Sequence, residues 1–282
     1  RTDSMTPHLP GRRTLAVVAA ILGLVGCQRD APLSSNTLRV GMSLERPGFA
    51  VRTPQGIAGF DVDVATYVAR RLGRDSIDII ETPPAQLAMV LATGQVDLVV
   101  SGLPMTEDRA AEMITVAGPY LTGSQRLMTR LGSALTVQHL AGRRVCTVTG
   151  TTAQDLVVAT MPGVHLITRN NHPDCIDALI DRTVDGVLAD DIILTGYAGD
   201  PVYGPQVTLK RAVAATEAYG IGLPQGEQAS CRQVDAALAE MIASGAWQRA
   251  AQTNLASLGY VVTPTLNPPP PQPCAALPSV SG

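Results

Sequence analysis

Two carboxylates stand where a glycine turn leads into an amphipathic helix, and this junction limits the folds open to the chain. Residues 59–64 read Gly-Phe-Asp-Val-Asp-Val and run directly into the stretch 65–72. Apolar residues recur there at four-residue spacing, which buries one helix face: Val64, Val68 and Leu72. Asp61 or Asp63 can cap this helix or complement its positive end. The pattern predicts an α/β unit bordering a ligand cleft.

Strand-like and helix-like segments alternate along the 282 residues, which predicts a largely parallel sheet covered by helices, in two lobes. The first set has strands at 38–42, 77–81 and 97–100 and helices at 61–72 and 85–93. After an interruption at Gly118-Pro119-Tyr120, a second set has strands at 144–148, 165–168 and 186–189 and helices at 152–160, 173–181 and 191–198. A returning strand, 219–223, precedes helices at 229–245 and 246–258. Residues 263–282 read as a polyproline or disordered tail.

The first 27 residues resemble an export signal. Arg12 and Arg13 precede an apolar run, Leu15 to Val25, which is too short to span a bilayer and ends before Cys27. The four residues ending at Cys27 resemble a bacterial lipobox, in which Cys27 becomes the lipidated N-terminus. The alternatives are an ordinary cleaved signal and a core helix. The formal net charge of −3 and the absence of a basic stripe argue against nucleic acid as a partner.

Four further cysteines form an even set in a chain with an export signal: Cys146, Cys175, Cys231 and Cys274. Disulfides are the expected state in an oxidising compartment. Pairing Cys146 with Cys175 would tie a strand to a helix, and pairing Cys231 with Cys274 would pin the tail, although three pairings are possible. Zinc is the competing interpretation, but the sequence has no CxxC and its histidines lack ligand-like spacing. We expect no metal and no cofactor.

Residues 59–72 resemble the signature of the family 3 extracellular solute-binding proteins, which capture polar amino acids for uptake. The resemblance extends over about residues 38–260. It implies an α/β fold of two Rossmann-like lobes joined by a two-crossing hinge, the type II periplasmic-binding-protein or Venus-flytrap arrangement. The implied segments are a lipoprotein signal peptide 1–26, a tether 27–37, first-lobe parts 38–118 and 221–262, hinges 119–123 and 217–220, a second lobe 124–216 and the tail 263–282.

Three elements of the sequence resemble the family's amino-acid site. Thr106 and Arg109 match its Thr-x-x-Arg element, whose arginine grips the α-carboxylate. Gly-Thr-Thr at 150–152 presents backbone N–H groups and hydroxyls at a helix start, which makes Thr151 and Thr152 candidate contacts. Asp190, at a strand end, matches the aspartate that receives the ammonium group. The alternative for each element is ordinary helix capping, a role we also expect for Asp191.

The ungapped run from His172 to Asp191 and the later run Glu217-Ala218-Tyr219-Gly220 most resemble the glutamate/aspartate-binding branch of the family. In that branch the residue matching His172 meets the distal carboxylate, and the residue matching Phe49 covers the ligand's stem; a turn and core packing are the alternatives. Gly102 and Asp61 complete the expected contacts. The sequence departs from many relatives at Pro104 and Val148. Proteins that bind acidic ligands usually supply a second arginine, and Arg46 and Arg126 are the candidates for it on position alone.

The resemblance implies a monomeric, lipid-anchored binding protein on the outer face of the cytoplasmic membrane. It would capture a polar amino acid, with glutamate or aspartate favoured over glutamine or asparagine, and deliver it to the permease of an ABC transporter. A sensor that signals through a membrane partner is the first alternative. An enzyme on the same scaffold, a dehydratase or a lytic enzyme, is the second, with Glu107 and Glu217 as the nearest candidates for its general acid.

Overall fold

The computed structural model describes residues 2, 36–106, 114–213, 216–270, 272 and 274. The chain divides into two units, residues 1–30 and residues 31–282, and every helix and strand described below belongs to the second. Two five-stranded sheets form its framework, and a small three-stranded sheet accompanies them. Within the described residues, no helix is both long and apolar enough to cross a bilayer.

The first sheet has the strand order β5-β1-β6-β13-β7. Strands β1, β5 and β6 are parallel, whereas β13 runs antiparallel to β6 and β7. The strands are β1 (Thr37–Met42), β5 (Ser76–Glu81), β6 (Leu98–Pro104), β7 (Ile114–Gly123) and β13 (Glu217–Pro224). Strand β6 is buried throughout, as its central place and apolar sequence require.

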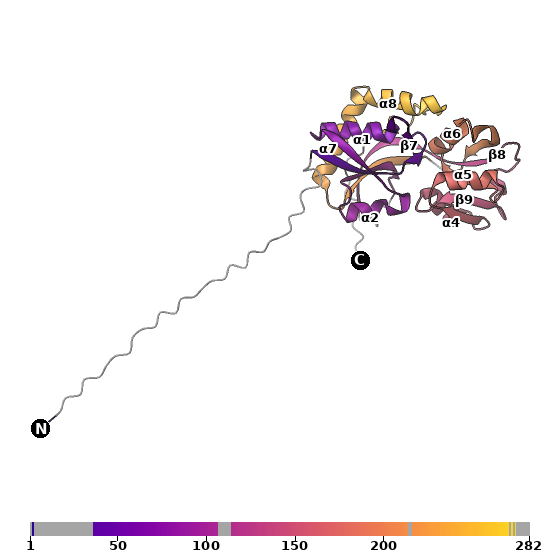
Figure 1. The fold of residues 1–282 in the computed structure, drawn as a ribbon, viewed down its shortest axis with the longest axis horizontal. Coiled ribbons are helices and arrows are strands. Elements are labelled where there is room, and N and C mark those ends of the chain that lie inside the picture. Colours follow the sequence, from indigo (N-terminus) through magenta and orange to yellow (C-terminus); the bar gives the residue numbers. More distant parts are fainter. Residues whose placement is uncertain are drawn as a thin grey trace. The chain divides into compact units, whose positions relative to one another are not determined.

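Helices cover both faces of this sheet. In Figure 1, α1, α7 and α8 gather on one face and α2 lies on the other. The helices are α1 (Phe60–Arg71), η1 (Pro84–Gln86), α2 (Leu87–Ala92), α7 (Gln228–Ala243), α8 (Ala246–Asn254) and η4 (Ala256–Leu258). A small sheet of β2 (Glu45–Arg46), β3 (Ala50–Thr53) and β4 (Gly56–Ala58) precedes α1. We call these elements the first lobe.

The second sheet has the order β10-β9-β11-β8-β12. Its strands are β8 (Gln125–Arg130), β9 (Arg144–Val148), β10 (His165–Arg169), β11 (Gly186–Asp190) and β12 (Val207–Ala212). Around it lie η2 (Val137–His139), α4 (Thr152–Thr160), α5 (His172–Ile180), α6 (Asp191–Gly199) and η3 (Gly204–Gln206). We call these elements the second lobe. The chain passes between the lobes twice, through Ser124 and between Ala212 and Glu217.

Most predicted elements are confirmed to within two residues, but three expectations are wrong and several strands were not predicted. Both large sheets are mixed rather than largely parallel. The predicted interruption at 118–120 lies inside β7, where Pro119 is tolerated because β7 is a sheet edge. The helix predicted at 85–93 is a 3-10 turn followed by the shorter α2. The strands β2–β4, β8 and β12 were not predicted.

The expected aspartate caps are also wrong. Helix α1 begins after Gly59, and Asp61 and Asp63 lie in its first turn without capping it, so at the helix start these carboxylates complement the helix dipole rather than bond to its free N–H groups. Asp191 is the first residue of α6 and its Oδ2 accepts a hydrogen bond from Ser124 Oγ. The predicted hinge residues lie within β7 and β13, and the domain boundaries stay a prediction.

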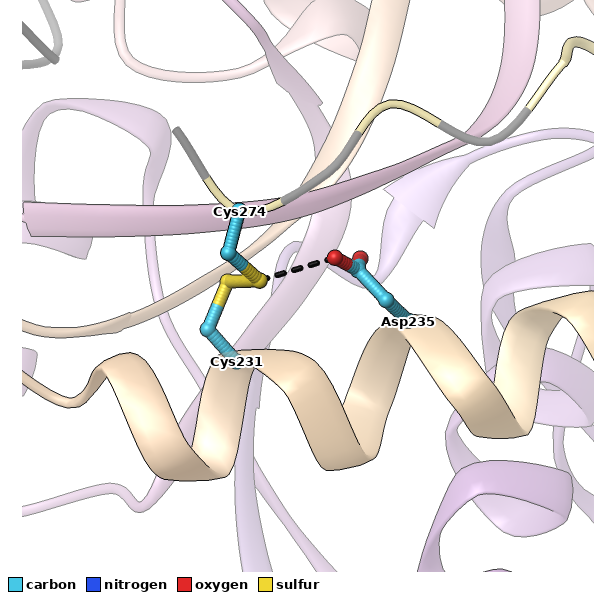
Figure 2. Close-up of side chains that lie close together, drawn as sticks. All are labelled: Cys231, Asp235 and Cys274. Carbon is cyan, nitrogen blue, oxygen red and sulfur yellow. Dashed lines mark hydrogen bonds between the residues drawn. A yellow bond between two sulfur atoms is a disulfide. The ribbon is translucent and has the colours of Figure 1, made fainter. Parts of the chain in front are cut away.

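Both suggested disulfides are present, Cys146–Cys175 between β9 and α5, and Cys231–Cys274 between α7 and the tail. Figure 2 shows the second bond with the Asp235 carboxylate 2.8 Å from Cys274 Sγ. The described part of the tail also packs against β7. Asn267 is buried, its Oδ1 accepts from Thr122 N and its Nδ2 donates to Thr122 O. This part of the tail is therefore ordered, against the disordered alternative.

Candidate functional site

A small cavity lies where the two lobes meet. The first lobe lines it with Arg46, Pro84, Leu87 and residues 101–104, and the second with residues 150–152 and Asp190. The cavity volume is about 20 Å³, on the order of the space that one buried water needs. In this structure the lobes are therefore closed on each other.

A buried ion pair joins the lobes inside this cavity. Arg46 Nη2 donates to Asp190 Oδ2 at 2.9 Å, and both side chains are less than a tenth exposed. Arg46 Nη1 donates to the carbonyl of Ser101, and the guanidinium lies 4.9 Å from the Phe49 ring centre. Burial disfavours its charge, but Asp190 and Asp61 outweigh that effect and raise the pKa of Arg46. Its Nε has no hydrogen-bond partner among the described residues.

Asp190 ends β11, where the carboxyl ends of parallel strands form the ligand edge of α/β sheets. Its Oδ1 accepts from Tyr219 Oη at 2.5 Å and from Gln125 Nε2 at 3.1 Å. The Gln125 amide reaches two further oxygens, Thr152 Oγ1 at 3.2 Å and Glu217 Oε2 at 2.9 Å. Burial, and then the charge of Asp190, raise the pKa of Glu217 to about 7 against the hydrogen bonds from Gln125 and Thr152.

Asp61 supports the cavity from behind. It is fully buried, its Oδ1 accepts from Tyr120 Oη at 2.6 Å, and its Oδ2 accepts from Gly102 N at 2.9 Å. Gly102 lines the cavity with a positive φ of 49°, and a Cβ there would lie within 3.2 Å of Arg46 and Phe49. Burial raises the pKa of Asp61 to about 6, although Tyr120 and Arg46 work against the shift.

Thr151 and Thr152 line the cavity at the start of α4. Thr151 Oγ1 donates to Val148 O at 2.7 Å, so this hydroxyl stabilises the turn that follows β9. The preceding Gly150, with a φ of 77°, touches the first lobe directly, because a Cβ on it would lie 2.6 Å from Ala85 Cα. This close approach leaves no room for a side chain when the lobes are closed.

Three further predicted contacts belong to the described residues, and none of the three lines the cavity. His172 is buried under β2, with Nδ1 3.9 Å from Glu45 Oε1, and the described cavity lining does not include it. Phe49 is buried behind Arg46, 5.5 Å from the Tyr219 ring. Thr106 is partly buried and also outside that lining. Arg109 and Cys27 lie outside the described residues.

Sequence reasoning gave little weight to three residues that the structure brings to this site. Arg46 was a positional guess, and its partner Asp190 is 144 residues away. The other guess, Arg126, donates its Nε to Lys210 O on β12. Gln125 had no motif, and Tyr219 occurred in the run Glu217-Ala218-Tyr219-Gly220 without a role assigned to it. The signal for Gln125 was its place beside the crossing, a polar residue at the start of a strand that is otherwise largely buried.

A metal centre has little support in the part of the chain that the structure describes. The group there that could gather ligand atoms is Cys231, Asp235 and Cys274. Its two sulfurs are bonded to each other (Figure 2), so neither is a thiolate ligand. What the cavity does offer is one cation, one anion, and polar groups on both sides, an arrangement suited to a small zwitterion.

Comparison with known proteins agrees with this geometry. The profile of the bacterial extracellular solute-binding proteins, family 3, matches residues 38–256. The glutamate-binding protein GluB of Corynebacterium glutamicum is 30% identical, over 90% of this chain and 95% of that protein. The ABC transporter glutamine-binding protein GlnH of Bacillus subtilis is 26% identical, over 73% and 76%.

Among solved structures, an ancestral arginine-binding protein bound to glutamine has a TM-score of 0.73 and 25% identity, and the match covers 78% of this chain and 98% of that one. The fold is therefore the two-lobe type II fold of the amino-acid-binding proteins, as the sequence predicted. The chain belongs to the bacterial extracellular solute-binding proteins of family 3, a family of binding proteins rather than enzymes.

Proposed function

We propose that this protein captures an acidic amino acid, glutamate or aspartate, by closure of its two lobes, and delivers it to the permease of an ABC transporter. Glutamine and asparagine are the next candidates. The observation that supports this proposal best is the buried ion pair between Arg46 and Asp190 in the cavity between the lobes.

This ion pair has the charges that an amino acid could replace. A ligand ammonium can take the place of the guanidinium at Asp190, which frees Arg46 to bind a carboxylate through two parallel charge-assisted bonds. Breaking a buried pair without such compensation costs about 3–5 kcal/mol. A ligand that brings both charges avoids this cost, whereas a purely anionic or purely cationic ligand leaves one partner unpaired.

The charge balance of the cavity favours an acidic ligand. In the described lining, Arg46 balances Asp190, and the resemblance to the family adds a second cation, Arg109. The two other buried carboxyls near the cavity ionise reluctantly, since burial raises the pKa of Asp61 to about 6 and that of Glu217 to about 7. An excess of positive charge suits a ligand with one net negative charge, and the name of the Corynebacterium relative points the same way.

Lobe closure has support in contacts between the lobes. Tyr197 Oη on α6 donates to the carbonyl of Glu45 on β2 at 2.8 Å. Gly196, also on α6, faces Pro47 with no space for a Cβ, and Gly150 faces Ala85 in the same way. Because the cavity holds little more than one water, the lobes must separate to admit an amino acid and close again around it. A shift from mostly open to mostly closed needs about a 10⁴-fold preference of the ligand for the closed form.

The site of action in the cell follows from the first residues of the chain. We propose that Cys27 is lipidated and anchors the protein on the outer face of the cytoplasmic membrane, beside its permease. Support comes from the charge, length and lipobox pattern of residues 12–27 and from the transporter in the name of the Bacillus relative. Replacing Cys27 with Ser should move the protein from the membrane fraction to the soluble fraction.

Calorimetry of the domain lacking residues 1–27 tests the ligand, with glutamate, aspartate, glutamine, asparagine and arginine as probes. Tight binding of glutamate or aspartate supports the proposal, and Arg46→Ala should weaken it by at least about tenfold. Arg52→Ala is the matched control, because Arg52 sits on the neighbouring β3 in an exposed pair with Glu81. If only glutamine or asparagine binds, the ligand is an amide rather than an acidic amino acid. If none of the five amino acids gives a binding signal, the ligand is not one of this set.

A further inference from the structure

Gln125 lies at the junction between the hinge and the candidate site. It is the first residue of β8, directly after the crossing at Ser124, and it is 3% exposed. Its backbone pairs with Asp190 across the β8–β11 ladder, and Glu217 pairs with Gly123 across the β7–β13 ladder. The two crossings therefore meet beside this one side chain.

The Gln125 amide touches three side-chain oxygens from three different elements. Nε2 lies 2.9 Å from Glu217 Oε2, 3.1 Å from Asp190 Oδ1 and 3.2 Å from Thr152 Oγ1. Two of these acceptors are carboxylates, which require the NH₂ end of the amide and so fix its orientation. Two hydrogens serve three acceptors, so Asp190, Thr152 and Glu217 share this donor.

The other end of the amide is unsatisfied. Gln125 Oε1 is buried and has no hydrogen-bond partner among the described residues. An unpaired buried acceptor destabilises a protein, and such groups are found where another property of the residue is needed. Here that property is the pair of N–H donors aimed at Asp190 and Thr152, both of which line the cavity.

We propose that Gln125 is a positioning residue for the ligand site. Its NH₂ group holds the Asp190 carboxylate and the Thr152 hydroxyl in the geometry that receives the ligand, and it ties both to Glu217 on the second crossing. This inference rests on the proposed function, since it takes Asp190 and Thr152 as ligand contacts. Gln125 itself is not among the described residues that line the cavity. It acts on the affinity through Asp190 and Thr152, which do line it.

Three variants separate this role from simple packing. Gln125→Ala removes the two N–H donors. Gln125→Glu keeps the shape of the side chain but replaces the carboxamide with a carboxylate, so that an oxygen instead of the NH₂ group faces Asp190 and Glu217. Gln95→Glu makes the same chemical change in an exposed side chain outside the site, where Gln95 Nε2 contacts only Thr93 Oγ1 among the described residues. Thermal unfolding identifies any variant that fails to fold.

The test is calorimetry with the five amino acids named above at pH 7.5 and pH 5. We expect Gln125→Ala to bind the preferred amino acid about 10- to 100-fold more weakly than wild type at both pH values. Gln125→Glu should be weaker still at pH 7.5, and its deficit relative to wild type should shrink at pH 5, where a protonated carboxyl can donate again. Gln95→Glu should match wild type.

Two outcomes would overturn the proposal. Wild-type affinity in Gln125→Ala would show that the donors do not matter, and a Gln125→Glu deficit that is the same at both pH values would show that the loss is one of packing. Failure of the acidic ligand is a separate result: if wild type binds an amide or arginine instead, the proposed ligand is wrong, and Gln125 is judged with the amino acid that binds.

Discussion

The two lobes share an architecture but contribute opposite chemistry to the cavity between them. The first lobe supplies a guanidinium, Arg46, and an apolar wall that includes Leu87 and Leu103. The second supplies a carboxylate, Asp190, and the hydroxyl of Thr152. Among the described lining residues, neither lobe alone carries both charges. Under the proposed function, a site divided in this way is complete only when the lobes close, which would couple binding to closure.

The lobes also differ in how the strand beside the crossing is secured. In the second lobe, β8 lies inside its sheet between β11 and β12, and the disulfide Cys146–Cys175 is buried in the core. In the first lobe, β7 is the sheet edge, and the tail with the disulfide Cys231–Cys274 lies along it. An edge strand needs such cover, because its outer N–H and C=O groups lack a neighbouring strand.

The largest effect should come from removing the charge that the second lobe contributes. Asp190→Asn keeps the shape of the side chain but leaves the Arg46 guanidinium buried without its counter-charge. We expect the free energy of unfolding to fall by about 3–5 kcal/mol and amino-acid binding to be lost in calorimetry. Asp185→Asn is the control, because Asp185 precedes the same strand and pairs with the half-exposed Arg144; its effect should be below about 1 kcal/mol. Equal effects of the two changes would contradict a special role for Asp190.

The two disulfides should stabilise their lobes about equally but differ in access. Their sequence separations of 29 and 43 residues correspond to about 3.6 and about 4.0 kcal/mol in the chain-entropy estimate. Replacing either pair with alanines should therefore lower the free energy of unfolding by similar amounts in urea titrations.

Access distinguishes the two bonds, because Cys146 and Cys175 are fully buried whereas Cys274 is partly exposed. Thiolate attack requires access to a sulfur, so a mild reductant followed by alkylation and mass spectrometry should label Cys231 and Cys274 first. Earlier labelling of Cys146 and Cys175 would show that the second lobe opens more readily than the first.

A smaller effect, of opposite sign, is expected from Glu217 beside the second crossing. Burial raises the pKa of this carboxyl from 4.5 to about 7, so between these values the folded protein holds a proton that the unfolded chain has released. Its contribution to stability is therefore fully present below pH 4.5 and lost as the pH rises through 7. Glu217→Gln removes this loss and should raise the free energy of unfolding by about 1–3 kcal/mol at pH 8.

The pH profile provides the control for Glu217. At pH 4 the variant and the wild type should unfold alike, because the wild-type carboxyl is then protonated in both states. Burial also raises the pKa of Asp61 to about 6, so the Glu217→Gln variant still loses some stability as the pH rises through this value. A stabilisation of Glu217→Gln that is equal at pH 4 and pH 8 would contradict the titration of this group.

The sequence predicted the helices and strands whose buried residues follow a pattern that is visible in a short stretch of sequence. Strand β9 and helix α4 have the predicted bounds, because a buried apolar run and a four-residue spacing need no knowledge of distant residues. Strand β7 was missed because its Gly-Pro pair is a turn signal that only its place at the sheet edge makes acceptable. Strand β8 was missed because its polar residues, which suggest an exposed segment, have partners inside the fold: Gln125 contacts Glu217, and Arg126 and Arg130 donate to backbone carbonyls of the second lobe.

The site shows the same division between local and distant information. Asp190 and Gly150-Thr151-Thr152 occur at strand ends, a position that a sequence reveals, and the structure places them on the cavity. Arg46 stands in a two-residue strand with no motif, and its importance depends on Asp190, which only the fold brings near. His172 was a candidate contact only by resemblance, and its local sequence, a histidine before a proline, equally fits a turn; in the fold its Nδ1 lies 3.9 Å from Glu45 Oε1.

The smallest effect concerns the difference between β7, an edge strand covered by the tail, and β8, which is paired with a strand on each side. Asn267 Oδ1 accepts from Thr122 N at 2.8 Å and its Nδ2 donates to Thr122 O at 2.9 Å, so one side chain takes the place of a neighbouring strand at the open edge of β7. Asn267→Ala leaves a buried N–H unpaired and should cost about 1–2 kcal/mol of unfolding free energy. It should also speed hydrogen exchange at the Thr122 amide.

The control for Asn267 is Asn254→Ala, which removes a similar pair of contacts, to Asp63 and Ala250, at the end of α8 and away from β7. It should leave exchange at Thr122 unchanged. Amides of β8, secured by strands on both sides, should keep their protection in both variants. Unchanged protection of Thr122 in Asn267→Ala would mean that the Asn267 side chain does not secure the edge of β7, and that the pairing of β7 with β13 and its contacts with the covering helices are sufficient.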